Sequence, residues 1–223
     1  MRTAASPDAV AATAPAKPLL RGVSHEIAAF VALAAWIALA AVAPSGRGRA
    51  AANVYGASLF TLFLVSAAYH RPNWRARARA WMRRLDHSAI FLLIAGTYTP
   101  LCLLLPRSTG LLVLAIVWGG AALGIVQTML WVHAPKPLVV AIYLALGWAA
   151  VPILPALREM LGTTALVLLA AGGAAYTVGA LIYAARRPDP FPRVFGYHEV
   201  FHALVIAAAA CHFAVVARAI PGL

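Results

Sequence analysis

The segment FGYHEVFHALV, at residues 195–205, contains the pattern H-E-x-x-H in His198, Glu199 and His202. On a helix, residues four apart share one face with Cβ atoms about 5–6 Å apart, so both imidazoles can reach one ion. In soluble proteins this pattern is typical of a zinc protease helix, in which the glutamate is the general base. Here an almost entirely apolar run, ALVIAAAACHFAVVARAI, follows it. His198 and His202 therefore predict a metal site, and the motif alone does not decide which kind.

Three further polar residues at the ends of apolar runs could complete such a site. His70 closes the run FLVSAAYH, and Ser66 lies one helical turn before it. Asp86 lies at the start of the run RRLDHSAIFLL. Three imidazoles with a vacant fourth position describe a catalytic zinc site rather than a closed structural one. There Asp86 could accept a proton from the zinc-bound water or orient it, and the Ser66 hydroxyl could hold that water or a carboxylate.

The bulk composition predicts that lipid is the solvent of this chain. Its 223 residues are 63% hydrophobic and 11% charged, with a mean hydropathy of +0.85. A soluble domain is about half apolar and about a quarter charged. The net charge of +12 does not indicate nucleic-acid binding, because the basic residues lie between apolar runs rather than on one face of a soluble fold. Cys102 and Cys211 each lie within an apolar run and are predicted to be free.

Seven stretches are long and apolar enough to cross the hydrocarbon layer, which takes about 20 residues of helix. None alternates as a membrane-spanning strand does. The predicted fold is an all-α, seven-transmembrane helix bundle over residues 21–223, after a flexible tail at residues 1–20 that lacks the apolar core of a signal peptide. The predicted spans are residues 26–43, 51–70, 86–105, 110–131, 137–155, 163–185 and 198–218.

Basic residues are distributed unequally between the two ends of these spans. If the N-terminus is cytoplasmic, 13 of the 18 lysines and arginines fall in cytoplasmic segments. Most of the bias comes from RPNWRARARAWMRR at residues 71–84, which is interpreted as a loop on anionic headgroups, with Trp74 and Trp81 among its arginines. The positive-inside rule therefore predicts a cytoplasmic N-terminus and an external C-terminus. The expected location is a plasma membrane of bacterial type.

This topology brings the polar candidates to one membrane level. The second predicted span ends on the cytoplasmic side, where the third and the seventh begin. His70, Asp86, His198 and His202 therefore lie at similar depth, although up to about 130 positions separate them in the sequence. Ionisable side chains within spans are costly, so their agreement in depth favours a functional site over four unrelated interfacial residues.

The other histidines are weaker candidates. His25 precedes the first predicted span and is interpreted as a helix cap or an interfacial group, although it lies on the cytoplasmic side. His87 is rotated about 100° from Asp86 around the helix and is expected to face another helix. His212 lies about 15 Å beyond His202 along the helix and cannot share its ion.

Three segments resemble the hemolysin III family, which belongs with the adiponectin and progestin receptors and, more remotely, with the alkaline ceramidases. They are SAAYH at 66–70, RRLDHSAIFLLIAGTYTP at 83–100 and FGYHEVFH at 195–202. The family pattern is S-x-x-x-H on the second helix, an aspartate on the third and H-x-x-x-H on the seventh. All three parts occur here in order, and the likeness covers about residues 21–218.

The resemblance implies a zinc ion held by His70, His198 and His202, with Asp86 and Ser66 near its water. It does not decide what the ion does, because members are named for red-cell lysis, receptor relatives are credited with hormone binding, and ceramidase-like relatives hydrolyse a lipid amide. One hypothesis is a zinc-dependent hydrolase of a lipid amide or ester. The alternative is a non-catalytic sensor or membrane-perturbing protein with structural zinc. Membrane lipid is the expected partner, and nucleic acid is not.

A peptidase and a passive pore are disfavoured. A zincin takes its third ligand from beyond the motif, where only His212 remains as a histidine and is too distant. Glu199 is rotated about 100° from His198 and is expected to face elsewhere. Charged residues that could line a pore are nearly absent away from the cytoplasmic ends of the spans.

Overall fold

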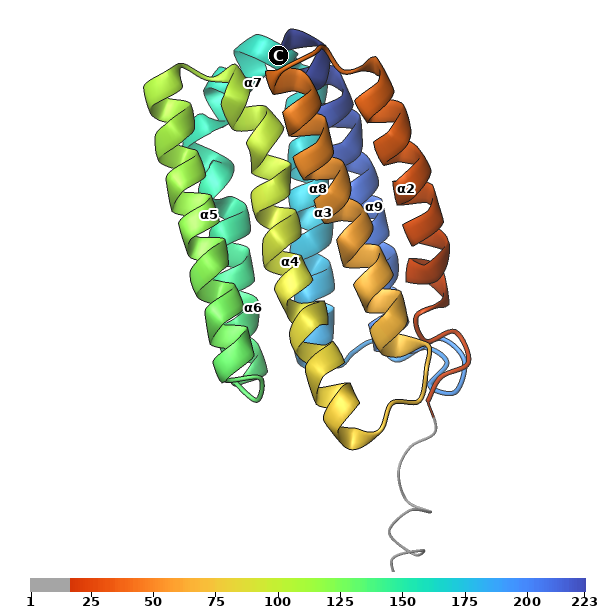
Figure 1. The fold of residues 1–223 in the computed structure, drawn as a ribbon. Helices are drawn as coiled ribbons and strands as arrows, with labels where there is room; N and C mark the ends of the chain where they lie inside the picture. The colour runs from red at the N-terminus through yellow and green to blue at the C-terminus, as the bar shows by residue number, and fades with distance from the viewer. Residues whose placement is uncertain (1–16) are drawn as a thin grey trace, which may run out of the picture.

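The computed structural model describes residues 17–223, which form a bundle of helices without a strand in that range (Figure 1). Seven of its helical segments are long and apolar enough to cross a membrane, which confirms the predicted all-α, seven-helix fold. The spans are α2 (Val23–Val42), α3 (Arg47–His70), α4 (Ala76–Leu104), α5 (Arg107–Leu130), α6 to α7 (Lys136–Leu161), α8 (Thr163–Ala185) and α9 (Tyr197–Ala219). Most of the tail predicted at residues 1–20 lies outside the described residues.

Proline and glycine set the boundaries between the spans. Pro106 and Pro135 immediately precede α5 and α6, where the missing N–H of proline costs no helical hydrogen bond. Gly162 separates α7 from α8 with a φ of 83°, a conformation that side chains other than glycine disfavour. These short breaks make sequential spans run in opposite directions, as a seven-span topology requires.

The third span begins ten residues earlier than predicted. Helix α4 starts at Ala76 rather than at residue 86, so the interpretation of residues 71–84 as a loop holds only up to Arg75. Alanine and arginine are strong helix formers, and hydrated arginines let a helix continue past the end of the hydrocarbon layer. The exposed Trp81 lies on this extension, with the Arg84 guanidinium 5.2 Å from its ring centre.

The fifth span is broken rather than continuous. Helix α6 (Lys136–Gly147) passes into a 3₁₀ turn, η1 (Trp148–Ile153), and then into α7 (Leu154–Leu161). Pro152 lies within the turn, where it removes a backbone donor and prevents a regular α-helix. Only Val140 of α6 is buried, so this helix packs more loosely than its neighbours.

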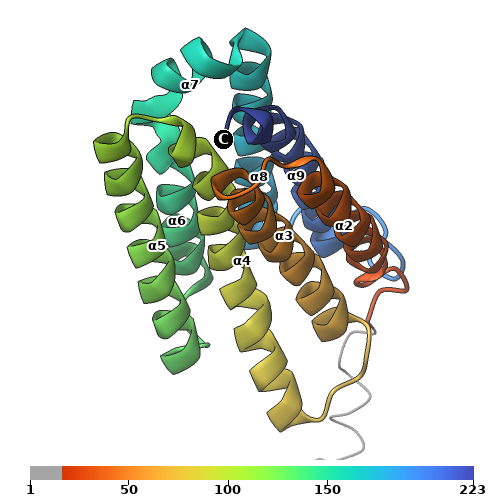
Figure 2. The same cartoon turned by 45° about the horizontal axis from the view of Figure 1, so that its top comes forward.

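The two ends of the bundle differ in character. At the end that we call the basic end, α3 and α8 finish while α4 and α9 begin, and the arginine-rich start of α4 extends beyond the other helices (Figure 1). At the opposite end the short turn η2 (Ile220–Gly222) brings the C-terminus beside the start of α3 (Figure 2). That the basic end faces the cytoplasm stays a prediction from the positive-inside rule.

Candidate metal centre

Three imidazoles from two distant segments converge at the basic end of the bundle. His70 is the last residue of α3, and His198 and His202 lie in the first two turns of α9. One ring nitrogen of each lies within 4.8 Å of the other two, and the Nε2 atoms of His70 and His198 are 3.2 Å apart. The structure thus brings together the three ligands that the sequence predicts, and this cluster could hold a metal ion.

Local structure fixes where α9 begins and which face its histidines present. Glu199 accepts a hydrogen bond from the backbone N–H of Gly196 at 2.8 Å, which satisfies a donor at the start of the helix. His198 and His202 then share one face because they are four residues apart. Gly22, the residue before α2, packs against His70 and has a φ of 81°. A Cβ at this position would lie 2.8 Å from the Cβ of His70. Glycine is therefore needed for this close approach.

The donor set suits a transition metal. His202 and His198 are buried, with 1% and 8% of their surface exposed. The His202 ring makes no side-chain hydrogen bond within residues 17–223, and its Nδ1 atom is buried without a partner. A buried polar atom left unpaired is costly unless another ligand meets it. Three neutral imidazoles are a set that zinc and similar divalent metals prefer over magnesium or calcium.

Asp86 and Ser66 lie beside the histidines. The carboxylate Oδ2 of Asp86 is 3.9 Å from Nε2 of His70, a separation too long for a hydrogen bond. Ser66, buried on α3, adjoins the Asp86 carboxyl and also lies 2.8 Å from Nδ1 of His25. Both residues are thus next to the cluster, and the roles assigned to them from the sequence stay predictions.

His25 is not the cap or interfacial group that its sequence position suggested. It is 3% exposed, and its ring stacks on that of His202. The interpretation was wrong because α2 begins at Val23, which places His25 inside the first turn rather than before the helix. The sequence did contain an indication of this position, because the predicted membrane depth of His25 is that of His70 and of the start of α9.

Glu199 is turned away from the histidine cluster. Its carboxylate forms an ion pair with the Nε of Arg21 and caps α9, and only 2% of its side chain is exposed. It is not among the clustered ligand groups of the described residues. This placement gives no support to Glu199 as the general base of a zinc protease. It agrees with the expectation that Glu199, rotated about 100° from His198, faces elsewhere.

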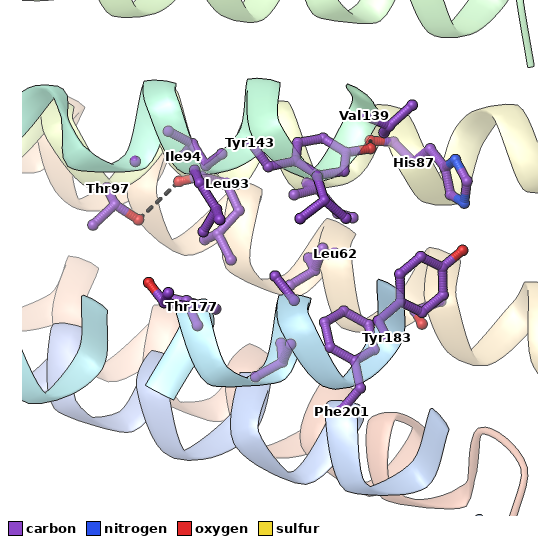
Figure 3. A pocket seen from close by; sticks show the side chains of 18 of the residues that line it. Leu62, His87, Leu93, Ile94, Thr97, Val139, Tyr143, Thr177, Tyr183 and Phe201 are labelled. Atoms are coloured by element: carbon purple, nitrogen blue, oxygen red, sulfur yellow. Dashed lines mark hydrogen bonds between the residues drawn. The ribbon is translucent and has the colours of Figure 1, made fainter. Parts of the chain in front are cut away.

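A cavity of about 490 Å³ adjoins the histidine cluster inside the bundle. Its wall comes chiefly from α4, α6, α8 and α9 and is mostly apolar, with Leu62, Ile94 and Phe201 among the lining side chains (Figure 3). His87, expected to face another helix, also lines it, and its backbone carbonyl accepts a hydrogen bond from the Tyr143 hydroxyl of α6. All three clustered histidines and Asp86 contribute to the same wall.

Most of the chain is similar in sequence to one described family of proteins. The chain matches the family described as haemolysin-III related over residues 13–213. It is 34% identical to hemolysin-3 of Bacillus cereus over 200 residues, covering 87% of this chain and 88% of that protein. It is 29% identical to the human monocyte to macrophage differentiation factor over 172 residues, covering 72% and 66%.

A more distant match is the Drosophila melanogaster adiponectin receptor protein, 32% identical over 153 residues, which covers 58% of this chain and 33% of that receptor. The bacterial relatives and the seven apolar helices identify a multi-pass integral protein of the cell membrane. The family match covers residues 13–213, which include all three clustered histidines, and by this match the chain belongs to the haemolysin III family.

Proposed function

We propose that this protein is a zinc-dependent hydrolase that cleaves an amide or ester bond of a membrane lipid. The observation that carries the proposal is the convergence of three imidazoles next to a carboxylate on the wall of an apolar cavity. A purely structural metal site would normally be closed by a fourth protein ligand. Among the described residues no fourth ligand group joins the cluster, and Asp86 lies beside His70 without a hydrogen bond to it.

The donor set would hold zinc through His70, His198 and His202. When bound, zinc supplies Lewis acidity that activates water and polarises a carbonyl group. The chain itself supplies the positions of the ligands, since α3 and α9 are packed into one bundle and both histidines of α9 are buried.

Asp86 is the proton carrier of the proposed reaction. Its carboxylate would take a proton from the attacking water and return it to the leaving amine or alcohol, while the remaining hydroxyl joins the carbonyl carbon and the C–N or C–O bond breaks. Ser66 adjoins this carboxyl and would keep it oriented. Because both groups lie next to the histidines, no large movement is needed to bring them to a substrate bound there.

The cavity supplies the preference for a lipid. An apolar space of about 490 Å³ is within the range of pockets that enclose small-molecule ligands, and it can shelter a hydrocarbon chain from water. The histidines lie at one end of the bundle, at the depth where the polar linkage of a bilayer lipid joins its chains. The substrate would therefore enter with its chain in the cavity and its linkage at the cluster.

The proposal is tested with purified protein offered ceramides and acyl esters, with fatty-acid release measured by mass spectrometry. We expect release that requires zinc, stops on chelation, and is lost in His202→Ala. If zinc-loaded protein releases no fatty acid, or if His202→Ala releases as much as wild type, the hydrolase proposal is wrong.

A second candidate is a non-catalytic protein in which the metal ties helices together. It is favoured by one fact: His70 and His202 are 132 positions apart on different helices, so one ion would cross-link α3 to α9. Zinc would then raise the thermal stability strongly, and Asp86→Asn would leave the biological effect of the protein unchanged. Because bound zinc stabilises the fold in either case, Asp86→Asn is the variant that separates the two candidates.

A further inference from the structure

Four cationic residues of the described chain line the cavity, and one of them, Arg21, is paired with Glu199; the other three lie at the basic end. Arg79 and Arg83 lie on successive turns of α4, and Lys136 is the first residue of α6. We call these three residues the mouth cations. They share this end of the cavity with Tyr183 and His87, whose side chains are seen together in Figure 3.

The mouth cations lack carboxylate partners among residues 17–223. Glu199 pairs with Arg21 and Glu26 pairs with Arg71, and Asp86, which lines the same cavity, has its one ion-pair contact in the described chain with His70. Aromatic rings hold two of the cations instead: the Nζ of Lys136 lies 4.6 Å from the ring centre of Tyr183, and the guanidinium carbon of Arg79 lies 5.8 Å from that of Tyr69. Their charge is positioned but not neutralised.

The positive-inside rule does not account for this placement. It requires basic residues near the end of a span but is indifferent to the face on which they lie. Arg75 and Arg77, at the start of the same helix, are exposed and do not line the cavity, whereas the exposed Arg79 and the half-buried Arg83 and Lys136 do. Cations beside an apolar space are costly without an anion, and an amphiphile with an anionic headgroup matches both parts of the surface.

We propose that the mouth cations bind the phosphate of an anionic lipid whose hydrocarbon chain occupies the cavity. This inference rests on the proposed function, since it names the substrate class of the same site. With a rise of 1.5 Å per residue, Arg83 and Arg79 lie about 5 and 10 Å nearer to the start of α4 than Asp86 does. A lipid whose phosphate is separated from its acyl linkage by a short polar backbone would therefore reach both the mouth and the histidine cluster.

The test compares two ligands that differ only in the phosphate. Oleoyl lysophosphatidate and mono-oleoylglycerol have the same chain and glycerol, and their affinities are measured by calorimetry on zinc-loaded protein in micelles of a maltoside detergent, which carries no phosphate. We expect the phosphate-bearing lipid to bind wild type about tenfold more tightly or better, as one or two charge-assisted hydrogen bonds would give.

Two double variants locate the preference. Arg83→Gln with Lys136→Gln removes two mouth cations and should bring the two affinities to within about twofold. Arg75→Gln with Arg77→Gln removes the same charge from the exposed turn and should keep the wild-type preference. Equal affinities in wild type, or an equal loss of preference in both double variants, would overturn the inference.

Further measurements distinguish a lipid phosphate from free phosphate, and failure of the phosphate-site inference from failure of the hydrolase proposal. Inorganic phosphate should compete poorly, because it cannot fill the cavity; competition at concentrations similar to those of the lipid would show a phosphate site and overturn the lipid inference. A phosphate preference without any hydrolysis rejects the hydrolase proposal and retains the mouth site. Hydrolysis of neutral lipids at an unchanged rate in the mouth variant, without a preference in binding, rejects the mouth site alone.

Discussion

The imidazole of His25 lies flat against that of His202, with ring centres 3.7 Å apart and ring planes 7° from parallel. The Nδ1 atom of His25 also lies 2.8 Å from the hydroxyl of Ser66, so this one side chain links α2, α3 and α9 beside the candidate metal centre. Metal-binding histidines are usually oriented by a hydrogen bond from the second ring nitrogen. In the described part of the chain the His202 ring makes no side-chain hydrogen bond, so we expect the stacked ring of His25 to orient it instead.

His25→Ala should therefore weaken metal binding although His25 is not in the ligand cluster. Loss of an orienting partner typically lowers metal affinity by about 10–100-fold. His25→Phe keeps a flat ring against His202 and should retain more of the affinity than His25→Ala does. Zinc affinity is measured by competition with a chromophoric chelator, alongside the melting temperature of each variant. Wild-type affinity in both variants would mean that the stack has no part in binding.

Removal of a proposed ligand should abolish binding. His70→Ala leaves two imidazoles from one helix, so the zinc content of the purified protein should fall from about one ion per chain to a background level. The matched control is His212→Ala, since His212 lies deeper on α9, where its Nε2 is 3.3 Å from the carbonyl oxygen of Leu169. Elemental analysis of both variants gives the result. Equal zinc content in the two variants would contradict the assignment of the three-histidine site.

Metal binding should also stabilise the fold. A ligand that binds only the folded state, supplied at about 100 times its dissociation constant, adds about 2.7 kcal/mol to the free energy of unfolding. Zinc should accordingly raise the melting temperature of wild type and of His212→Ala, but not that of His70→Ala. Thermal unfolding with and without a chelator measures the difference, and an equal rise in all three proteins would indicate nonspecific binding.

Asp86→Asn should separate chemistry from binding. The amide keeps the size of the side chain and removes the proton acceptor, so lipid hydrolysis should fall by about 10²–10⁴-fold. Zinc content should stay at the wild-type level, because the nearest ligand atom, Nε2 of His70, is already 3.9 Å away. Turnover and elemental analysis are measured on the same preparation. An active Asp86→Asn would favour the non-catalytic candidate or another proton carrier.

Much of this site could be predicted from the sequence, for a physical reason. The length and polarity of the apolar runs determine how many helices cross the membrane and at which depth each polar residue lies, so His70 and Asp86 could be placed at the level of His198. The four-residue spacing of His198 and His202 determines that they share a face. These arguments need no knowledge of which helices are neighbours.

The features that the sequence did not predict depend on lateral packing. Nothing in the hydropathy of α2 indicates that its first turn lies against α9, so the stacking of His25 on His202 was not anticipated. The early start of α4 was missed because hydropathy measures transfer into lipid, whereas arginine and alanine form helix in water as well. The pairing of Arg21 with Glu199 joins a residue that precedes the first span to one in the first turn of the seventh, and this contact follows only from the folded chain.

A glycine on α4 gives a test of how helix packing supports the site. A Cβ at Gly96 would collide with Ser58 of α3, whose own Cβ would be 2.7 Å away, and Ser58 is fixed by its hydrogen bond to the carbonyl oxygen of Tyr55. Gly96→Ala should therefore force α3 and α4 apart and lower the free energy of unfolding by about 1–3 kcal/mol.

The matched control is Gly119→Ala on α5, where an added Cβ meets nothing within 4 Å among the described residues. Alanine is the better helix former, so this change should be neutral or stabilising by up to about 1 kcal/mol. Because α3 carries His70 and α4 carries Asp86, a wider spacing should also reduce hydrolysis in Gly96→Ala while zinc, held by α3 and α9, is retained. Thermal melting, turnover and zinc content are measured for the two alanine variants. If the variants do not differ, the contact of Gly96 with Ser58 does not set the distance between Asp86 and the proposed metal ligands.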